Sequence, residues 1–157
     1  MTKARILIID DDKNIRESLA MCLETEGYIV DKAENGQEAI AKSSANFYNL
    51  AIIDWRLPDI DGTELIGELK ETTPKMAKIM LTGYPSMKNA IAAVNKRADA
   101  FLLKPTEFSV LLAKIKELLK LQEEATHYNQ DKVAEFIETR TRDIVEAEIS
   151  KESVGHY

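Results

Sequence analysis

The run Arg5-Ile6-Leu7-Ile8-Ile9-Asp10-Asp11-Asp12 places a hydrophobic segment directly before three acidic residues. A short apolar run of this kind is typical of a buried β-strand. Carboxylates gathered at one strand end repel one another and titrate as a coupled set, so a bound cation would stabilise them. Because every ligand atom is an oxygen, the expected cation is Mg²⁺ or Mn²⁺. Alternatively, one acid caps the helix that follows, and Asp12 is suitably placed for that role.

The same pattern of an apolar run followed by polar residues recurs along the chain. Three further apolar segments lead into polar residues at their carboxyl ends: 50–53 into Asp54, 78–81 into Thr82-Gly83, and 100–103 into Lys104-Pro105. Apolar residues at helical spacing mark the segments 15–23, 39–40, 65–69, 91–94 and 111–119. Alternating strands and helices with short links predict an α/β fold, in which a parallel sheet is covered by helices on both faces.

The polar residues at the strand ends predict where the functional site lies. In an open parallel sheet, ligands bind beyond the carboxyl ends of the strands, near the point where the strand order reverses. The residues that end or directly follow the apolar segments are Asp10, Asp11, Asp54, Thr82 and Lys104. We therefore expect these five side chains to converge on one site.

These residues and their neighbours resemble a known family. The matching motifs are Asp10-Asp11, Asp54-Trp55-Arg56-Leu57-Pro58, Asp61-Gly62, Thr82-Gly83, and Phe101 three residues before Lys104-Pro105. Together they make residues 3 to about 122 similar to the receiver domain of two-component response regulators. The resemblance implies a doubly wound sheet of five parallel strands in the order 2-1-3-4-5. It also predicts a receiver domain over residues 1–122, followed by an acidic helical extension over residues 123–157.

The resemblance also implies a chemistry for the acidic residues. Asp54 would be the phosphoacceptor, receiving a phosphoryl group from a histidine kinase. A divalent cation, Mg²⁺ or Mn²⁺, would be held by Asp10, Asp11, Asp54 and the main-chain carbonyl of Arg56. The chain is then a signalling switch and not an enzyme, apart from self-phosphorylation from a phosphodonor and slow autodephosphorylation.

In addition to the acids, the family's site contains a lysine, a hydroxyl residue and an aromatic residue, which match Lys104, Thr82 and Phe101 here. Lys104 and Thr82 would contact the phosphoryl oxygens, and Thr82 and Phe101 would form the switch pair. The Lys104–Pro105 peptide bond is commonly cis in the family. The alternatives are that Lys104 is a solvated surface lysine and that Phe101 is an ordinary core aromatic. Replacing Lys104 or Thr82 by alanine is expected to spare stability but to abolish the response to phosphorylation.

Residues beside the expected site are candidates to modulate it. Arg56 and Tyr84 lie two residues beyond Asp54 and Thr82, where bulky side chains would shield the phosphoaspartate from water and lengthen its lifetime. Gly83 should leave its loop more mobile. Cys22 has no cysteine to pair with, and we expect it to be buried on the apolar face of its helix.

Two other classes of protein remain to be compared with the receiver. An aspartyl-nucleophile phosphatase also attacks through an Asp at a strand end, but usually has a second acid two residues later, where this chain has Arg56. An inert interaction module on a receiver scaffold would often lose the acceptor, the lysine or the acids. All five positions are occupied here, so both alternatives are disfavoured.

Composition and the C-terminal segment bear on location and partners. The sequence has no run of eighteen apolar residues and no signal-peptide pattern, which predicts a cytoplasmic protein that does not contact a membrane. Residues 123–157 carry nine acids against four bases, and the whole chain has a net charge of −6. Acidic segments repel phosphate backbones, so nucleic-acid binding is disfavoured. We expect a stand-alone receiver whose output is contact with a protein partner.

The C-terminal segment has the pattern of an amphipathic helix from about residue 129 to 150. On a helical projection an apolar stripe forms from Val133, Phe136, Ile137, Ile144 and Ala147, with Arg140 at its centre. Gln122, Thr126 and Asn129 interrupt the apolar pattern before it, and the chain either turns near residues 126–131 or continues as one helix. We expect the stripe to pack against a second copy of the chain, giving a homodimer; docking on its own receiver domain is the alternative.

Overall fold

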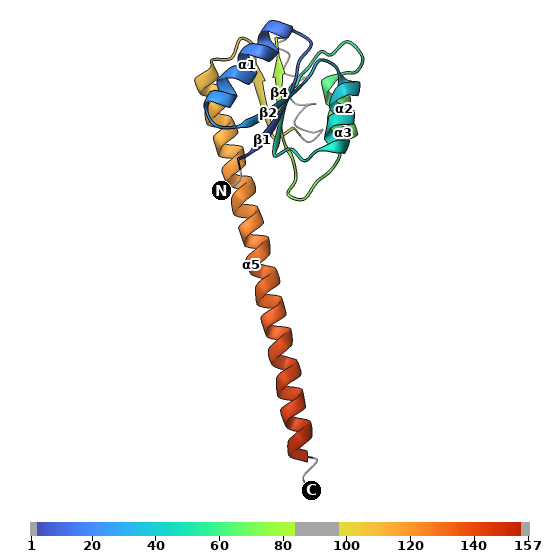
Figure 1. Ribbon diagram of the computed structural model, residues 1–157, viewed down its shortest axis with the longest axis vertical. Coiled ribbons are helices and arrows are strands. Elements are labelled where there is room, and N and C mark those ends of the chain that lie inside the picture. Colours follow the sequence, from blue (N-terminus) through green and yellow to red (C-terminus); the bar gives the residue numbers. More distant parts are fainter. Residues whose placement is uncertain (1–2, 84–97, 155–157) are drawn as a thin grey trace. The chain divides into compact units, whose positions relative to one another are not determined.

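The structure is a computed structural model that describes residues 3–83 and 98–154, with side chains described up to residue 151. Its centre is a five-stranded parallel sheet in the order β2-β1-β3-β4-β5 (Figure 1). The strands are β1 (Arg5–Ile9), β2 (Ile29–Ala33), β3 (Leu50–Asp54), β4 (Ala77–Thr82) and β5 (Ala100–Leu103). The fold class and strand order predicted from the sequence are confirmed.

The central strands β1, β3 and β4 are buried on both faces of the sheet because they are apolar along nearly their whole length. Side chains alternate between faces along a strand. In β1, Leu7 and Ile9 therefore belong to one core cluster, whereas Ile6 and Ile8 belong to the other. The first cluster is closed by helices α2 (Gly36–Ala45) and α3 (Gly62–Glu68), and the second by α1 (Lys13–Thr25) and α5 (Phe108–Val154), on opposite faces of the sheet (Figure 1). The four β1 residues, from Ile6 to Ile9, are fully buried.

Three helices of the receiver region begin at side chains that cap their N-termini. Helix α1 (Lys13–Thr25) begins after Asp12, whose carboxylate accepts from Asn14 N at 2.9 Å and Ile15 N at 3.2 Å. Helix α2 (Gly36–Ala45) is capped by Asn35, and α3 (Gly62–Glu68) by Asp61. Asp12 therefore has the capping role that the sequence suggested as an alternative to metal binding.

Helix α5 runs without interruption from Phe108 to Val154, so the chain does not turn near residues 126–131. The structure divides into two compact units, Met1–Gln122 and Glu123–Tyr157. In the first unit, Leu111 and Ile115 of α5 are buried against the sheet. The predicted helical segment 91–94 lies outside the residues that the structure describes.

The prediction for Cys22 is wrong, because its side chain is exposed. The buried residues of α1 are Ala20 and Leu23, and Cys22 precedes Leu23 by one residue, a rotation of about 100° around the helix. Cys22 instead lines a surface groove together with Leu19 and Leu111. Among the helices that the structure describes, none is long and apolar enough to cross a membrane.

Candidate functional site

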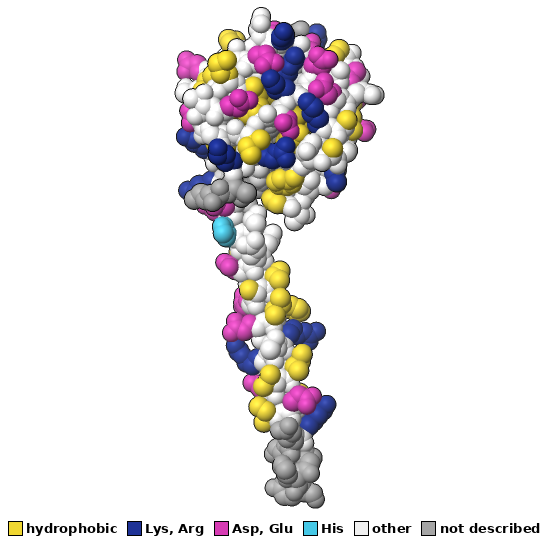
Figure 2. All heavy atoms as spheres, viewed as in Figure 1, with side chains coloured by type: hydrophobic (Ala, Val, Ile, Leu, Met, Phe, Trp, Pro, Cys, Tyr) yellow, Lys and Arg dark blue, Asp and Glu magenta, His cyan; other side chains and the backbone are white. Residues whose placement is uncertain are grey.

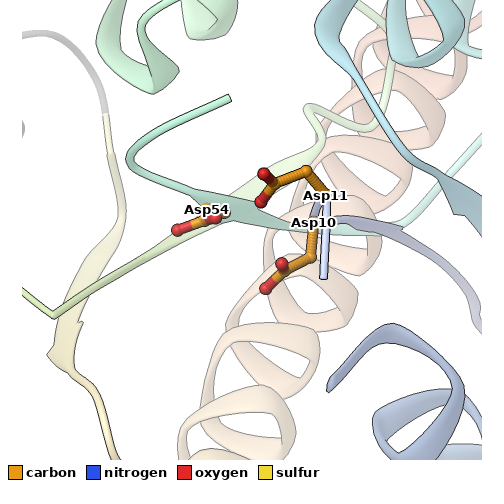
Figure 3. Close-up of side chains that lie close together, drawn as sticks. All are labelled: Asp10, Asp11 and Asp54. Carbon is orange, nitrogen blue, oxygen red and sulfur yellow. The ribbon is translucent and has the colours of Figure 1, made fainter. Parts of the chain in front are cut away.

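Three carboxylates meet at the carboxyl edge of the sheet. Asp10 directly follows β1 and Asp54 ends β3, and these strands are hydrogen-bonded neighbours. Ligand oxygens of Asp10, Asp11 and Asp54 all lie within 4.8 Å of one another (Figure 3). Asp10 is buried, Asp11 is exposed, and the Asp54 side chain is 12% exposed. The cluster is therefore buried on the side of Asp10 and open to solvent on the side of Asp11.

Lys104 reaches into this cluster from the end of β5. Its Nζ lies 3.0 Å from Asp10 Oδ2 and 3.2 Å from Asp54 Oδ1. Its backbone N–H donates to the Thr82 carbonyl, 2.6 Å away, which ties the ends of β5 and β4 together. The Lys104–Pro105 bond is cis, as the resemblance implied. Lys104 is thus an ion-paired residue of the site and not a solvated surface lysine.

The electrostatics of the site follow from burial and crowding. Burial and the neighbouring Asp10 carboxylate raise the pKa of Asp54 to about 6, although Lys104 opposes the shift. Burial alone would lower the pKa of Lys104, but its hydrogen bonds and charge interactions with Asp10 and Asp54 raise it. Three carboxylates face one ammonium group, so negative charge remains that a divalent cation would balance. The all-oxygen donor set fits a hard cation.

Thr82 and Phe101 lie on neighbouring strands, with Thr82 at the carboxyl edge and Phe101 paired with Met80, two residues before Thr82. Thr82 is the last residue of β4 and is 1% exposed. Phe101, in β5, is partly buried and packs against the core cluster under α2 and α3. Its ring meets the ring of Trp55 edge to face, with 6.1 Å between centroids. Phe101 therefore makes core contacts, and its role as a switch residue stays a prediction.

The candidate modulators lie at the rim. The Arg56 side chain is exposed, and the Arg56 backbone forms an isolated antiparallel bridge with Asp61. Gly83 is exposed, and a Cβ added there would meet no atom within 4 Å. Tyr84 lies outside the described residues. Shielding of a phosphoaspartate by Arg56 and Tyr84 stays a prediction.

The structure adds two contacts that sequence reasoning missed. Arg16, on α1, donates from a guanidinium nitrogen to the Asp10 carbonyl at 2.7 Å. Asp59, in the loop that follows β3, accepts hydrogen bonds from Gly36 N and Gln37 N at the start of α2. The Asp59 contacts join residues 22 and 23 positions apart. No local periodicity signals such a pair, so only the fold reveals it.

Comparison with known proteins decides the family. The response regulator receiver domain matches residues 6–116, which is most of the chain. The chain belongs to the response regulator receiver domain family. The transcriptional regulatory protein ResD of Bacillus subtilis is 34% identical over 129 residues, which are 81% of this chain and 52% of ResD. This chain therefore spans about half the length of that curated relative.

Solved receiver domains share both the fold and the sequence. A CheY-like response regulator receiver domain protein from Methanospirillum hungatei is 45% identical, with a TM-score of 0.75 over 79% of this chain and 99% of that one. The response regulator TrrA of Thermotoga maritima, solved in complex with Mg²⁺-BeF, is 38% identical, with a TM-score of 0.65 over 73% and 98%. The receiver domain described here is accordingly a module of phosphorylation-dependent two-component signalling.

Proposed function

We propose that this receiver domain is a switch in which Asp54 accepts a phosphoryl group from a phosphohistidine of a histidine kinase. The observation that carries the proposal is the position of the Asp54 carboxylate, within ion-pair distance of Lys104 and beside Asp10 and Asp11. Phosphoryl transfer depends mainly on positioning and charge neutralisation, and this cluster is arranged for both.

In the transfer, an oxygen of Asp54 forms a bond to phosphorus while the bond between phosphorus and the imidazole nitrogen breaks. The bonding electrons leave with the imidazole, and Asp54 becomes an aspartyl phosphate. Lys104 would pair with one phosphoryl oxygen, and the Thr82 hydroxyl would donate to another. Asp54 is ionised above its pKa of about 6, which keeps it nucleophilic at neutral pH.

The acidic cluster supports magnesium as the cofactor, with manganese as the alternative. Asp10, Asp11, Asp54 and the Arg56 carbonyl would hold the ion, with Asp10 acting through water. Bound magnesium supplies positive charge against the oxygens of the transferring phosphoryl group. The complex of TrrA with Mg²⁺-BeF supports the same choice of metal for this chain.

The readout of phosphorylation would begin at Thr82 and Phe101. The phosphoryl group carries about two negative charges in place of the single charge of the Asp54 carboxylate, and its contact with the Thr82 hydroxyl would favour an inward position of Phe101. The changed surface would then bind a protein partner. A turnover phosphatase is disfavoured because Arg56 replaces the second acid and its side chain is exposed.

The second unit offers a surface for self-association. On its helix the apolar side chains Val133, Phe136, Ile137 and Ile144 are all more than half exposed. Figure 2 shows hydrophobic and acidic side chains along this helix, mostly on opposite edges over the upper part of the helix in that view. Helices in proteins are stabilised mainly by the packing of an apolar face, which favours a partner for the hydrophobic edge. A second copy of the chain is the partner we propose, and the acidic charge of residues 123–157 disfavours nucleic acid.

Self-association is tested by light scattering coupled to size exclusion. The full chain should have the mass of a dimer, whereas a chain ending at Ala125 should be a monomer. A full-length Ile137→Asp, Ile144→Asp variant should also be a monomer, because charge in the stripe opposes its burial. Equal monomeric masses for all three proteins would exclude the dimer and favour docking on the receiver domain.

The switch itself is tested by intact mass spectrometry after incubation with acetyl phosphate. The parent chain should gain the mass of one phosphoryl group in the presence of Mg²⁺. Asp54→Asn and parent protein in excess chelator should gain none. Mass gain in either control would contradict the proposed acceptor or the proposed metal requirement, respectively.

A further inference from the structure

The loop between β3 and α3, residues 55–61, carries Arg56 and is closed at its base. Trp55 N donates to the Leu81 carbonyl, and Gly62 N donates to the Trp55 carbonyl, both at 2.8 Å. The Arg56 and Asp61 backbones pair across the loop in an antiparallel bridge. A Cβ at Gly62 would lie 2.7 Å from the Asp54 carbonyl oxygen, so the base tolerates only glycine there.

The tip of the same loop is fastened to a different element. Asp59 Oδ1 accepts from Gly36 N at 2.8 Å, and Asp59 Oδ2 accepts from Gln37 N at 2.9 Å, so both carboxylate oxygens bind the first turn of α2. These backbone hydrogen bonds, the one from Gly36 first, hold the pKa of Asp59 below its usual value. Ile60 also packs here, because a Cβ at Gly36 would lie 2.1 Å from Ile60 Cγ2.

Asp59 shares the capping of α2 with Asn35, the N-cap residue. Asn35 accepts from Glu38 N at 2.8 Å, and the Glu38 carboxylate accepts from Glu34 N at 3.3 Å. These bonds leave the Gly36 and Gln37 N–H groups of the first turn to the Asp59 carboxylate. The Asp59 contact therefore has two effects: it caps the first turn of α2, and it holds the loop tip against that helix.

We infer that Asp59 is a positioning residue that fixes the loop so that the Arg56 carbonyl is preorganised for the divalent cation. The inference rests on the proposed function, because it takes the Arg56 carbonyl as a metal ligand. Asp59 itself would not touch the metal. Residues that orient a ligand through hydrogen bonds influence metal affinity by about tenfold or more when they are replaced.

Two variants separate this role from a general effect on α2. Asp59→Ala removes both loop contacts, whereas Asn35→Ala removes a hydrogen bond from the same helix start without touching the loop. In the metal-free protein, hydrogen exchange of the backbone amides of residues 56–61 should speed up in Asp59→Ala and stay at the parental rate in Asn35→Ala. This readout does not depend on metal binding or phosphorylation.

The second readout is metal affinity, followed by fluorescence of Trp55, which is the only tryptophan in the chain. Mg²⁺ should bind about tenfold more weakly to Asp59→Ala and with parental affinity to Asn35→Ala. Phosphorylation of Asp59→Ala by acetyl phosphate should be slow at low Mg²⁺ and return to the parental maximum at saturating Mg²⁺. A lower maximum with unchanged Mg²⁺ dependence would contradict a positioning role.

A third variant guards against a folding defect in Asp59→Ala. Gly36→Ala keeps the Asp59 carboxylate but pushes Ile60 away from α2, so it should also weaken Mg²⁺ binding. Parental Mg²⁺ affinity and parental loop exchange in both Asp59→Ala and Gly36→Ala would overturn the inference. Failure of the proposed function looks different, because the parent chain itself would then bind no Mg²⁺ or accept no phosphoryl group.

Discussion

Helix α5 passes through two regions that use the same kinds of residue in opposite ways. Leu111 and Ile115, in the first unit, are 3% and 0% exposed, whereas Ile137 and Ile144, in the second, are 57% and 63% exposed. The helical spacing of apolar residues is similar in both. The difference teaches that periodicity places apolar side chains on one face of a helix, while burial depends on whether a matching surface is present.

The largest expected effect comes from truncating the same residue type in the two regions. Ile115→Ala removes a fully buried side chain from the sheet core and should lower the free energy of unfolding by about 2–5 kcal/mol. Ile144→Ala should change the unfolding of the receiver domain by less than about 0.5 kcal/mol, because surface substitutions are mild. Denaturant unfolding of both variants measures this. Equal losses would contradict the comparison.

The same difference between the two regions is expected for their ion pairs, since those of Lys104 in the first unit are partly buried and that of Arg142 in the second is exposed. Lys104→Ala leaves the buried Asp10 carboxylate beside Asp54 without its cation and should cost about 2–3 kcal/mol in chelator. From the sequence alone we expected this variant to keep nearly the parental stability; because of the two ion pairs we now expect a loss. Arg142→Ala breaks an exposed pair with Glu138, 3.5 Å long, and should cost about 0–0.5 kcal/mol. Thermal unfolding of the two variants decides between these values.

The raised pKa of Asp54 predicts how stability changes with pH. A carboxyl group with a raised pKa binds its proton more tightly in the folded state, so it favours folding at low pH. That contribution is lost as the pH rises from about 4, the unfolded value, to about 6. The loss should be about 2 kcal/mol, since one pKa unit is worth about 1.4 kcal/mol and the carboxyl keeps some contact with water.

Unfolding in chelator at several pH values measures this contribution, with Asp54→Asn as the control. The difference in stability between the variant and the parent should grow as the pH rises from 4 to 6 and then level off. A difference that does not change over this range would show that Asp54 titrates as an ordinary surface acid.

Within the first unit, the smallest effect is expected at Gln122, its last residue. Its side-chain nitrogen donates to the carbonyls of Asn49 and Lys75 at 2.9 and 2.7 Å, and its oxygen accepts from the Asn49 side chain at 3.0 Å. Gln122→Ala should cost about 1–2 kcal/mol, because the partner groups lie near the surface and regain water. Gln130→Ala, in the second unit, is the matched control and should be neutral in the same unfolding measurement.

The sequence predicted the sheet and the acidic cluster because both follow from short-range patterns. Apolar runs that end in acids mark parallel strands, and parallel strands bring their carboxyl ends to one edge. Asp10, Asp11, Asp54 and Lys104 therefore converge without any knowledge of loop geometry. Their ion-pair distances and the shift in the pKa of Asp54 depend on burial, which the sequence does not specify.

Other features depended on contacts that no local pattern encodes. The contact of Asp59 with α2 arises only after the loop and the helix have packed. Cys22 lies at the edge of an apolar stripe, where a rotation of one residue decides between burial and exposure. The interruption near residues 126–131 is polar but contains neither glycine nor proline, so it breaks the apolar stripe without breaking the helix.

The central claim is that the chemistry resides in the first unit and acts on Asp54. The most direct test is to phosphorylate the full chain with acetyl phosphate and Mg²⁺, reduce the acyl phosphate with borohydride, and locate the modified residue by tandem mass spectrometry. Reduction converts an aspartyl phosphate to homoserine. The account predicts homoserine at position 54 alone. Homoserine at Asp10, Asp11, Asp131 or Asp143, with Asp54 unchanged, would contradict it.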